Sequence, residues 1–334
     1  MMERTDIDAR FARFARTKVL VLGDVMLDAY LWGRVDRISP EAPVPVIHVQ
    51  ERGARLGGAA NVALNIQALG GEPIVVSMLG DDEQARRVGS LFEGHAMRAE
   101  GLLRSSERPT TVKTRVISGH QHIVRVDEEI DTPLSGAESE RMLRMVHDIV
   151  ERERPDVIVF EDYDKGALTP EVITATIELA RKKGVPTAVD PKKRNFLAYT
   201  DTDLFKPNLK ELREGLKLDL QAADRTAIRE AVRELEARLR NTTTLLTLSE
   251  HGVYVHRGDA EHFLPAHRRR IADVSGAGDT VIAVAALLLA QGADGATLAD
   301  LSNLAGGLVC EHVGVVPVER EAFLRECRTI AADT

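Results

Sequence analysis

The sequence is poor in cysteine, with only Cys310 and Cys327 among its 334 residues. Neither has a histidine or cysteine partner at the spacing of a metal site, and two cysteines give no disulfide framework, so we expect a reducing, cytoplasmic setting. The first residues lack the basic start and apolar centre of a secretion signal. The longest apolar run, residues 281–290, has about half the length that a membrane span needs. These absences predict a soluble protein.

Excess positive charge is also missing, since 52 acidic residues outnumber 44 lysines and arginines and give a formal net charge of −8. This balance disfavours binding to nucleic acids or anionic membranes, which are themselves negative. Apolar residues make up 44% and charged residues 29% of the chain, as in globular proteins. The partner that fits best is a small molecule, with at most a local basic pocket for a phosphate group.

Short runs of β-branched and aliphatic residues alternate with segments of helical periodicity. Such runs are typical of strands buried on both faces, and the alternation predicts an α/β fold with a mostly parallel central sheet and helices on both faces. The predicted strands cover residues 18–23, 73–78, 156–160, 185–190 and 243–248. The clearest predicted helices cover residues 138–152, 170–183 and 222–239. No repeat or linker divides residues 1–334, so we expect one domain.

Two segments break this alternation. Residues 43–50 contain prolines that favour extended backbone, and residues 110–127 have the pattern of a hairpin. We expect them to form a small second sheet that projects from the main body. Its apolar face would have to cover a site or meet another subunit.

The run Gly276-Ala277-Gly278-Asp279 directly precedes a strongly helix-forming segment. Backbone N–H groups at such a helix start can bind an anion, and the glycines allow a phosphate group to come close. Asp279 beside that site suits a base that takes a proton from an incoming hydroxyl group during phosphoryl transfer. The alternative is a plain glycine turn in which Asp279 caps the helix.

Glycines and polar residues also mark two earlier positions. Gly57 and Gly58 precede a helical segment with Asn61 in its first turn, where the side-chain amide can bond hydroxyl groups. Asp24 follows the first predicted strand, and ligands of parallel sheets bind at the carboxyl ends of the strands. Ordinary helix starts and caps would explain both patterns as well.

Asn208 and Glu211 have the spacing of a capping box, in which each side chain bonds the backbone of the other residue. The functional alternative is a polar pair that faces nucleotide phosphates and hydrated magnesium. Thr247, Ser249 and Gly252 follow another predicted strand with small groups that suit either a nucleotide pocket or a hairpin turn.

Taken in order, these motifs resemble the signatures of the ribokinase-like (PfkB) carbohydrate kinases, a GG-x-x-N segment near the start and a D-x-x-GAGD segment near the end, with N-x-x-E between them. The resemblance covers nearly the whole chain. It implies a ribokinase-like fold, ATP and Mg²⁺ as cofactors, a sheet lid formed by about residues 34–50 and 110–127, and a homodimer joined through that lid. It leaves a requirement for a monovalent cation open.

The resemblance also implies a role for each motif. Asp279 would be the base that deprotonates the sugar hydroxyl group. The anion hole would be formed by Gly276, Ala277 and Gly278. Asn208 and Glu211 would face the nucleotide phosphates and would contact magnesium through water. The nucleotide would be bound by Thr247, Ser249, Gly252 and Asn303. The sugar would be held by Asp24, Gly57, Gly58 and Asn61.

A narrower resemblance lies in residues 31–46 and in the segment EDYDKG at 161–166, which are similar to kinases of D-glycero-β-D-manno-heptose 7-phosphate. It implies phosphorylation of the C1 hydroxyl group to the 1,7-bisphosphate, on the route to ADP-heptose and lipopolysaccharide in a Gram-negative bacterium. Such kinases are often joined to an adenylyltransferase. This sequence ends at Thr334 without an HxGH motif, so we expect a stand-alone kinase.

The phosphate group that such a sugar already carries needs cations, and several are available. Lys165 and Lys192 are the first candidates, and Lys192 lies next to the predicted strand end at Asp190, which we also expect at the substrate. The remaining candidates are Lys193, Arg194, Lys113, Arg115 and Arg125. Any one of them is more often a solvated surface charge than a ligand.

Two other functions stay open at this stage. The signatures fix the chemistry and not the acceptor, so the substrate could be another sugar such as ribose, fructose 1-phosphate or a keto-deoxy sugar acid. An inactive relative that only binds a nucleotide would lack the base or the anion hole, and this sequence has both.

Overall fold

A mostly parallel sheet lies at the centre of the molecule. In the computed structural model, which describes residues 4–119, 121–267 and 269–332, this sheet has nine strands. Their order across the sheet is β13 (Ala260–Leu264), β12 (Val253–Arg257), β11 (Thr243–Thr247), β10 (Leu204–Phe205), β9 (Thr187–Asp190), β8 (Val157–Glu161), β1 (Lys18–Gly23), β4 (Glu72–Gly80) and β5 (Leu102–Ser105). Only the pairs β11–β12 and β12–β13 among these described strands are antiparallel. The predicted α/β class is confirmed.

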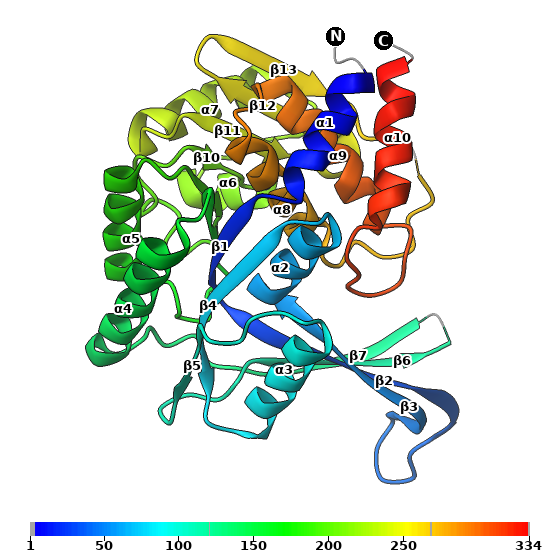
Figure 1. Cartoon of the computed structure of the whole chain (residues 1–334). Helices are drawn as coiled ribbons and strands as arrows, with labels where there is room; N and C mark the ends of the chain where they lie inside the picture. The colour runs from blue at the N-terminus through cyan, green and yellow to red at the C-terminus, as the bar shows by residue number, and fades with distance from the viewer. Residues whose placement is uncertain (1–3, 120, 268, 333–334) are drawn as a thin grey trace.

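Helices cover both faces of this sheet (Figure 1). One face carries α1 (Arg4–Phe14), α2 (Ala59–Ala68), α3 (Glu83–Gly94), α8 (Ala277–Ala290), α9 (Gly295–Val309) and α10 (Arg320–Ala332). The other carries α4 (Gly136–Glu153), α5 (Pro170–Lys183), α6 (Leu209–Leu216) and α7 (Arg225–Leu239). The first and last helices, α1 and α10, pack side by side through Phe11 and Phe323.

Alternate residues of the central strand β1 enter two different cores. Val19 and Val21 pack with α2 and α8, whereas Leu20 and Leu22 pack with α4 and α5, and all four are fully buried. Because helices cover both faces, every position of the strand can be apolar, which is the pattern that predicted it. Burial of each such side chain contributes about 1.5–3 kcal/mol to the stability of the fold. The central strands therefore hold the residues at their ends in fixed positions.

A second sheet projects from the main body (Figure 1). Its four strands, among the residues that the structure describes, have the order β3 (Pro45–Gly58), β2 (Val25–Ile38), β6 (Val112–Ser118) and β7 (Gln121–Glu128). The expected segments 34–50 and 110–127 cover only part of it. β2 already begins at Val25, one residue beyond β1, and β3 continues to Gly58 at the start of α2. His120, in the predicted hairpin turn, lies outside the described residues.

The structure describes both cysteines and allows the described helices to be checked for a membrane span. Cys310 and Cys327 are both buried, and both are free thiols. None of the described helices combines the length and the apolar character required to cross a bilayer.

The carboxyl ends of neighbouring parallel strands meet at one edge of the central sheet. Gly23 at the end of β1 pairs with Glu161 at the end of β8, and Glu161 pairs with Asp190 at the end of β9. α8 packs against β8 and β9, and α2 packs against α8. This edge therefore collects the polar residues that follow several strands and begin two helices.

Candidate functional site

Asp279 lies in the first turn of α8, and side chains from two other elements hold its carboxylate. Asn61 of α2 donates from Nδ2 to Oδ2 of Asp279 at 2.6 Å, and the Tyr163 hydroxyl group donates to Oδ1 at 2.7 Å. Asp279 is only 4% exposed. The residue in the N-cap position is Gly276, so Asp279 is not the helix cap considered as an alternative.

The surroundings of Asp279 also set its basicity. Burial raises the pKa of Asp279 to about 6, the hydrogen bonds from Asn61 and Tyr163 act to lower it, and the neighbouring charge of Asp190 raises it. A carboxylate with this pKa is mostly ionised at neutral pH and is a stronger base than an exposed aspartate. Both its geometry and its charge suit a group that accepts a proton.

Asp273 shapes the glycine loop that precedes α8. Its Oδ1 accepts hydrogen bonds from the backbone N–H and the hydroxyl group of Ser275, at 2.9 and 2.8 Å. The chain then passes through Gly276, whose φ of 81° lies in the left-handed region that glycine tolerates best. The N–H of Ala277 bonds the carbonyl of Val274 at 3.3 Å, so this amide of the expected anion hole already has a partner.

α2 is tied to α8 through two asparagines. Besides the bond from Asn61 to Asp279, the Asn65 Oδ1 accepts from the Thr280 hydroxyl group at 2.9 Å, and Asn65 donates from Nδ2 to the Asn61 carbonyl at 2.9 Å. All of these residues are buried. Asn61, expected at the sugar, is therefore also a residue that orients the carboxylate of Asp279.

Gly57 and Gly58 lie where β3 packs against β2. A side chain on Gly57 would collide with the carboxylate of Asp28, and one on Gly58 would collide with the carbonyl of Asp24. Asp28 in turn accepts a hydrogen bond from Arg115 of β6 in a buried ion pair. The glycine pair therefore lets β3 lie close to β2 and to Asp24, next to an ion pair within the second sheet.

Asp24 anchors the loop that carries Tyr163. Its Oδ2 accepts from the backbone N–H of Tyr163 at 2.9 Å and of Lys165 at 3.1 Å, and its Oδ1 accepts from the N–H of Ala167 at 3.1 Å. Burial nevertheless raises the pKa of Asp24. A sugar hydroxyl group would have to share these oxygens with the loop, so the sugar contact expected for Asp24 stays a prediction.

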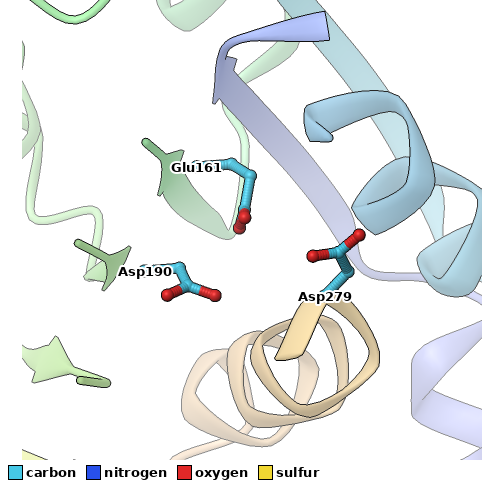
Figure 2. A group of neighbouring side chains, drawn as sticks. All are labelled: Glu161, Asp190 and Asp279. Carbon is cyan, nitrogen blue, oxygen red and sulfur yellow. The ribbon is translucent and has the colours of Figure 1, made fainter. Parts of the chain in front are cut away.

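Three buried carboxylates converge at the carboxyl edge of the sheet (Figure 2). Glu161 of β8, Asp190 of β9 and Asp279 of α8 each place an oxygen within 4.8 Å of the other two. Across residues 4–119, 121–267 and 269–332, neither oxygen of Glu161 has a hydrogen-bond partner. Burial, with the charges of Asp190 and Asp279, raises the pKa of Glu161 well above its usual value. Such a group needs a proton, a ligand hydroxyl group or a cation.

Two lysines partly balance this negative charge. Lys206 is buried and its Nζ lies 2.8 Å from Oδ2 of Asp190. Lys192 donates to Oε1 of Glu211 at 2.7 Å and lies 3.9 Å from Oδ1 of Asp190. A methyl group on Gly278 would come within 3.7 Å of Asp190 and 3.8 Å of Lys206, so the start of α8 faces this group. Lys192, expected at the sugar's phosphate, therefore lies beside Glu211, one of the residues expected at the nucleotide.

Asn208 and Glu211 form the capping box that their spacing predicts. Oδ1 of Asn208 accepts from the N–H of Glu211 at 2.9 Å, and Oε2 of Glu211 accepts from the N–H of Asn208 at 2.8 Å. Asn208 also pairs with Thr247 in an isolated bridge between backbones. The box therefore fixes the start of α6 beside the end of β11.

A cavity of about 480 Å³ lies beside this box. Asn208, Thr247 and Ser249, which the sequence predicted at the nucleotide, contribute to its wall, and their contact with a nucleotide stays a prediction. The wall also contains the cations Lys210 and Arg213 and the carboxylate Glu250, so positive charge is in excess and would attract a phosphate group.

Gly252 and Asn303 shape the chain around β12 and the segment after β13. Gly252 connects the turn after β11 to β12 with a φ of 89°. Asn303 of α9 donates from Nδ2 to the carbonyl of Pro265 at 2.9 Å and so holds the segment after β13. Contact of either residue with a nucleotide stays a prediction.

Glu161 and Tyr163 are residues of this site for which the sequence predicted no role. Glu161 ends its strand just as Asp190 does, so the rule for strand ends would have identified it. Tyr163 reaches Asp279 across 116 positions of sequence, and no local pattern signals such a contact.

The arrangement of the sheets is shared with solved structures of sugar kinases. The structure of phosphofructokinase-2 from Escherichia coli in complex with potassium has a TM-score of 0.78 to this chain and 18% identity, covering 95% of this chain and 99% of that one. Ribokinase of Arabidopsis thaliana, complexed with ribose and ATP, has a TM-score of 0.70 at 17% identity, covering 92% and 98%. This likeness defines the class of fold, which is ribokinase-like.

Residues 16–321 match the pfkB family of carbohydrate kinases, and the chain belongs to this family; it is an ATP-dependent carbohydrate kinase. The Bifunctional protein HldE of Acidiphilium cryptum is 42% identical over 309 residues, and that of Geobacter metallireducens is 38% identical over 319 residues. These matches cover 92% and 95% of this chain but 63% and 64% of the relatives. The chain thus spans less than two thirds of their length.

Proposed function

We propose that this kinase transfers a phosphoryl group from ATP to the C1 hydroxyl group of D-glycero-β-D-manno-heptose 7-phosphate in the cytoplasm, forming the 1,7-bisphosphate for ADP-heptose and lipopolysaccharide synthesis. The observation that carries the proposal is the position of Tyr163. It belongs to the segment 161–166 that resembles the heptose phosphate kinases, and its hydroxyl group bonds the carboxylate of Asp279. The segment that suggests the substrate therefore touches the expected base.

In the proposed reaction, Asp279 takes the proton of the C1 hydroxyl group as the sugar oxygen attacks the γ-phosphorus of ATP. The new O–P bond forms while the bond to the ADP oxygen breaks, and ADP leaves. Asn61 and Tyr163 keep the carboxylate in place through their hydrogen bonds. In the first turn of α8, the N–H groups of Gly278 and Asp279 have no partner within the helix and would stabilise charge on the transferred group, whereas the N–H of Ala277 already bonds Val274.

The nucleotide and Mg²⁺ belong on the side of α6 and β11. The unpartnered buried oxygens of Glu161, beside Asp190, form a set of hard oxygen donors that suits this cation. These two residues would hold Mg²⁺, with Asn208 and Glu211 acting through water. When bound, Mg²⁺ would neutralise charge on the ATP phosphates. Lys192 and Lys206 would add fixed positive charge at the same place.

A substrate panel tests this proposal. ADP formation would be measured with the β and α anomers of the heptose 7-phosphate, fructose 6-phosphate, fructose 1-phosphate and ribose, each with and without K⁺. We expect the highest kcat/KM for the β anomer and a product phosphorylated at C1. Preference for another acceptor, without turnover of the heptose phosphate, would contradict the choice of substrate and leave the kinase family intact.

We also propose that the second sheet is a lid and joins two copies of the chain. Its strands and the turn between β2 and β3 expose large apolar side chains, and exposed apolar patches on a projecting sheet favour association. These side chains are Ile38, Val44, Val49, Val124 and Val126. Light scattering should give twice the mass of the chain, and replacing Val124 and Val126 by lysine should give the monomer. A monomeric wild-type protein would contradict the proposal.

A further inference from the structure

Two lysines from different elements share one carboxylate beside the proposed sugar site. Lys113 of β6 and Lys165 of the loop after β8 each donate to Glu129 at 2.7 Å, one to each oxygen of the carboxylate. The side chains of Lys113 and Lys165 are only 13% and 17% exposed. The two ammonium groups are thus held close together in a mostly buried position.

The positions of these lysines place the pair at the border of the site. The backbone N–H of Lys165 bonds Asp24, and two residues earlier Tyr163 bonds Asp279. Lys113 lies directly opposite Asp28 in the register of β6 and β2. One lysine therefore belongs to the loop that reaches the base, and the other belongs to the sheet that we propose as the lid.

Glu129 lies outside the helices and strands of the two sheets. It lies beyond the end of β7, in the segment 129–135 that has no regular secondary structure before α4. Burial acts to raise the pKa of Glu129, but the hydrogen bonds and charges of Lys113 and Lys165 outweigh it and lower the pKa. Glu129 is therefore an ionised carboxylate in a place that attracts anions.

The cluster carries more positive than negative charge. Its cations are Lys113, Lys165 and Arg125, and its carboxylates are Glu129 and Asp127, to which Arg125 donates at 2.8 Å. A phosphomonoester carries a charge of about −1.5 to −2 and three acceptor oxygens, against one charge and two oxygens for a carboxylate. It would therefore satisfy two neighbouring ammonium groups better than Glu129 does.

We propose that Lys113 and Lys165 bind the phosphate group that the acceptor sugar already carries, and that Glu129 occupies their ammonium groups until that phosphate displaces it. This inference rests on the proposed function, because it names the residues that read the phosphorylated end of that substrate. The bound phosphate would replace Glu129 as the group that links the loop of Lys165 to the second sheet.

The other candidate cations have partners that point elsewhere. Lys192 bonds Glu211 and lies near Asp190, on the nucleotide side. Arg115 pairs with Asp28 inside the second sheet. Lys113 and Lys165 are the candidates that meet at one displaceable carboxylate.

The first experiment compares Lys113→Met, Lys165→Met and Glu129→Gln with the wild type in steady-state kinetics. Each lysine variant should raise the KM for the heptose 7-phosphate about 10- to 100-fold, as expected for loss of a charge-assisted hydrogen bond, with the KM for ATP unchanged. Turnover of the unphosphorylated heptose should fall much less, because that sugar lacks the group that the lysines bind. Glu129→Gln should lower the KM for the heptose 7-phosphate. Lys183→Met is the matched control, since Lys183 pairs with Glu151 between α4 and α5.

The second experiment is independent of the acceptor's identity. Binding of inorganic phosphate would be measured by calorimetry with a non-hydrolysable ATP analogue and Mg²⁺ saturating the nucleotide side. We expect binding to the wild type, tighter binding to Glu129→Gln and loss of binding in both lysine variants. Phosphate binding that the lysine variants leave unchanged, or a Glu129→Gln variant as impaired as they are, would overturn the inference. A wild type that binds phosphate through these lysines but ignores the heptose phosphate would overturn only the proposed substrate.

Discussion

The hydroxyl group of Tyr163 donates a hydrogen bond of 2.7 Å to the carboxylate of Asp279. This bond acts to lower the pKa of Asp279 against the effect of burial. Replacing Tyr163 by Phe should therefore raise that pKa above its value of about 6. We expect the acidic limb of the kcat/KM profile to move to higher pH, so activity falls more at pH 6 than at pH 8.

The matched control for this variant is Tyr254→Phe. Tyr254 is also a buried tyrosine that donates to a carboxylate, at 3.0 Å to Glu261, but it lies in β12 near the far edge of the sheet. Its removal should leave the pH profile in place. An unshifted profile in Tyr163→Phe would show that the bond does not set the basicity of Asp279.

The pH dependence of the wild type follows from the same pKa. Asp279 acts as a base only when ionised, and burial raises its pKa to about 6. Activity should be full well above pH 6 and should fall about tenfold per unit once the pH is well below it, because one proton must leave the carboxylate. Measuring kcat/KM for the acceptor between pH 4.5 and 8.5 tests this, with folding checked by circular dichroism. A limb centred near pH 4 would contradict it.

Asp24 should matter mainly for stability and for the order of the loop 163–167. Replacement by Ala would leave three backbone N–H groups without their acceptor, at a cost of about 1–3 kcal/mol for each group that stays buried and unbonded. We expect the free energy of unfolding to fall by about 2–4 kcal/mol in urea titrations. Asp294→Ala, which removes the N-cap of α9, should cost only about 1 kcal/mol. Equal effects of the two changes would contradict the anchoring role of Asp24.

Lys192 should support catalysis through its fixed charge. Its ammonium group lies between Glu211 and Asp190 and above the ring of Tyr163. Lys192→Met should lower kcat about 10²- to 10³-fold, the range found when one electrostatic donor to a transition state is removed. Lys18→Met, which removes a lysine bonded to Glu153, should have near-normal turnover. If only the KM for the acceptor rises, Lys192 binds the phosphate group of the sugar, as the sequence predicted, and the role in catalysis is contradicted.

The sequence predicted those parts of the fold that local patterns encode. Continuous apolar strands and periodic helices determined the α/β class, and the predicted helix 170–183 matches α5 at both ends. The capping box of Asn208 and Glu211 was predicted because its two residues are only three positions apart. The second sheet was only partly predicted, since β2 resumes at Val25 after a single residue and opens with three apolar residues, as a core strand does.

The contacts that define the site could not be predicted in the same way. Asn61 reaches Asp279 across 218 positions, and Asp24 reaches the loop of Tyr163 across 139. Such pairs depend on how the strands are ordered in the sheet, which periodicity does not determine. Asp24 is an example. A carboxylate at a strand end can bind a ligand or accept hydrogen bonds from the protein backbone, and the sequence pattern is the same in both cases.

The central claim is that Asp279 is the base of phosphoryl transfer, and the variant Asp279→Asn tests it most directly. Asparagine keeps the size of the side chain but cannot accept the proton, so kcat should fall about 10²- to 10⁴-fold while ATP binding, measured by calorimetry, stays close to that of the wild type. Near-normal turnover by a folded Asp279→Asn protein would contradict the account.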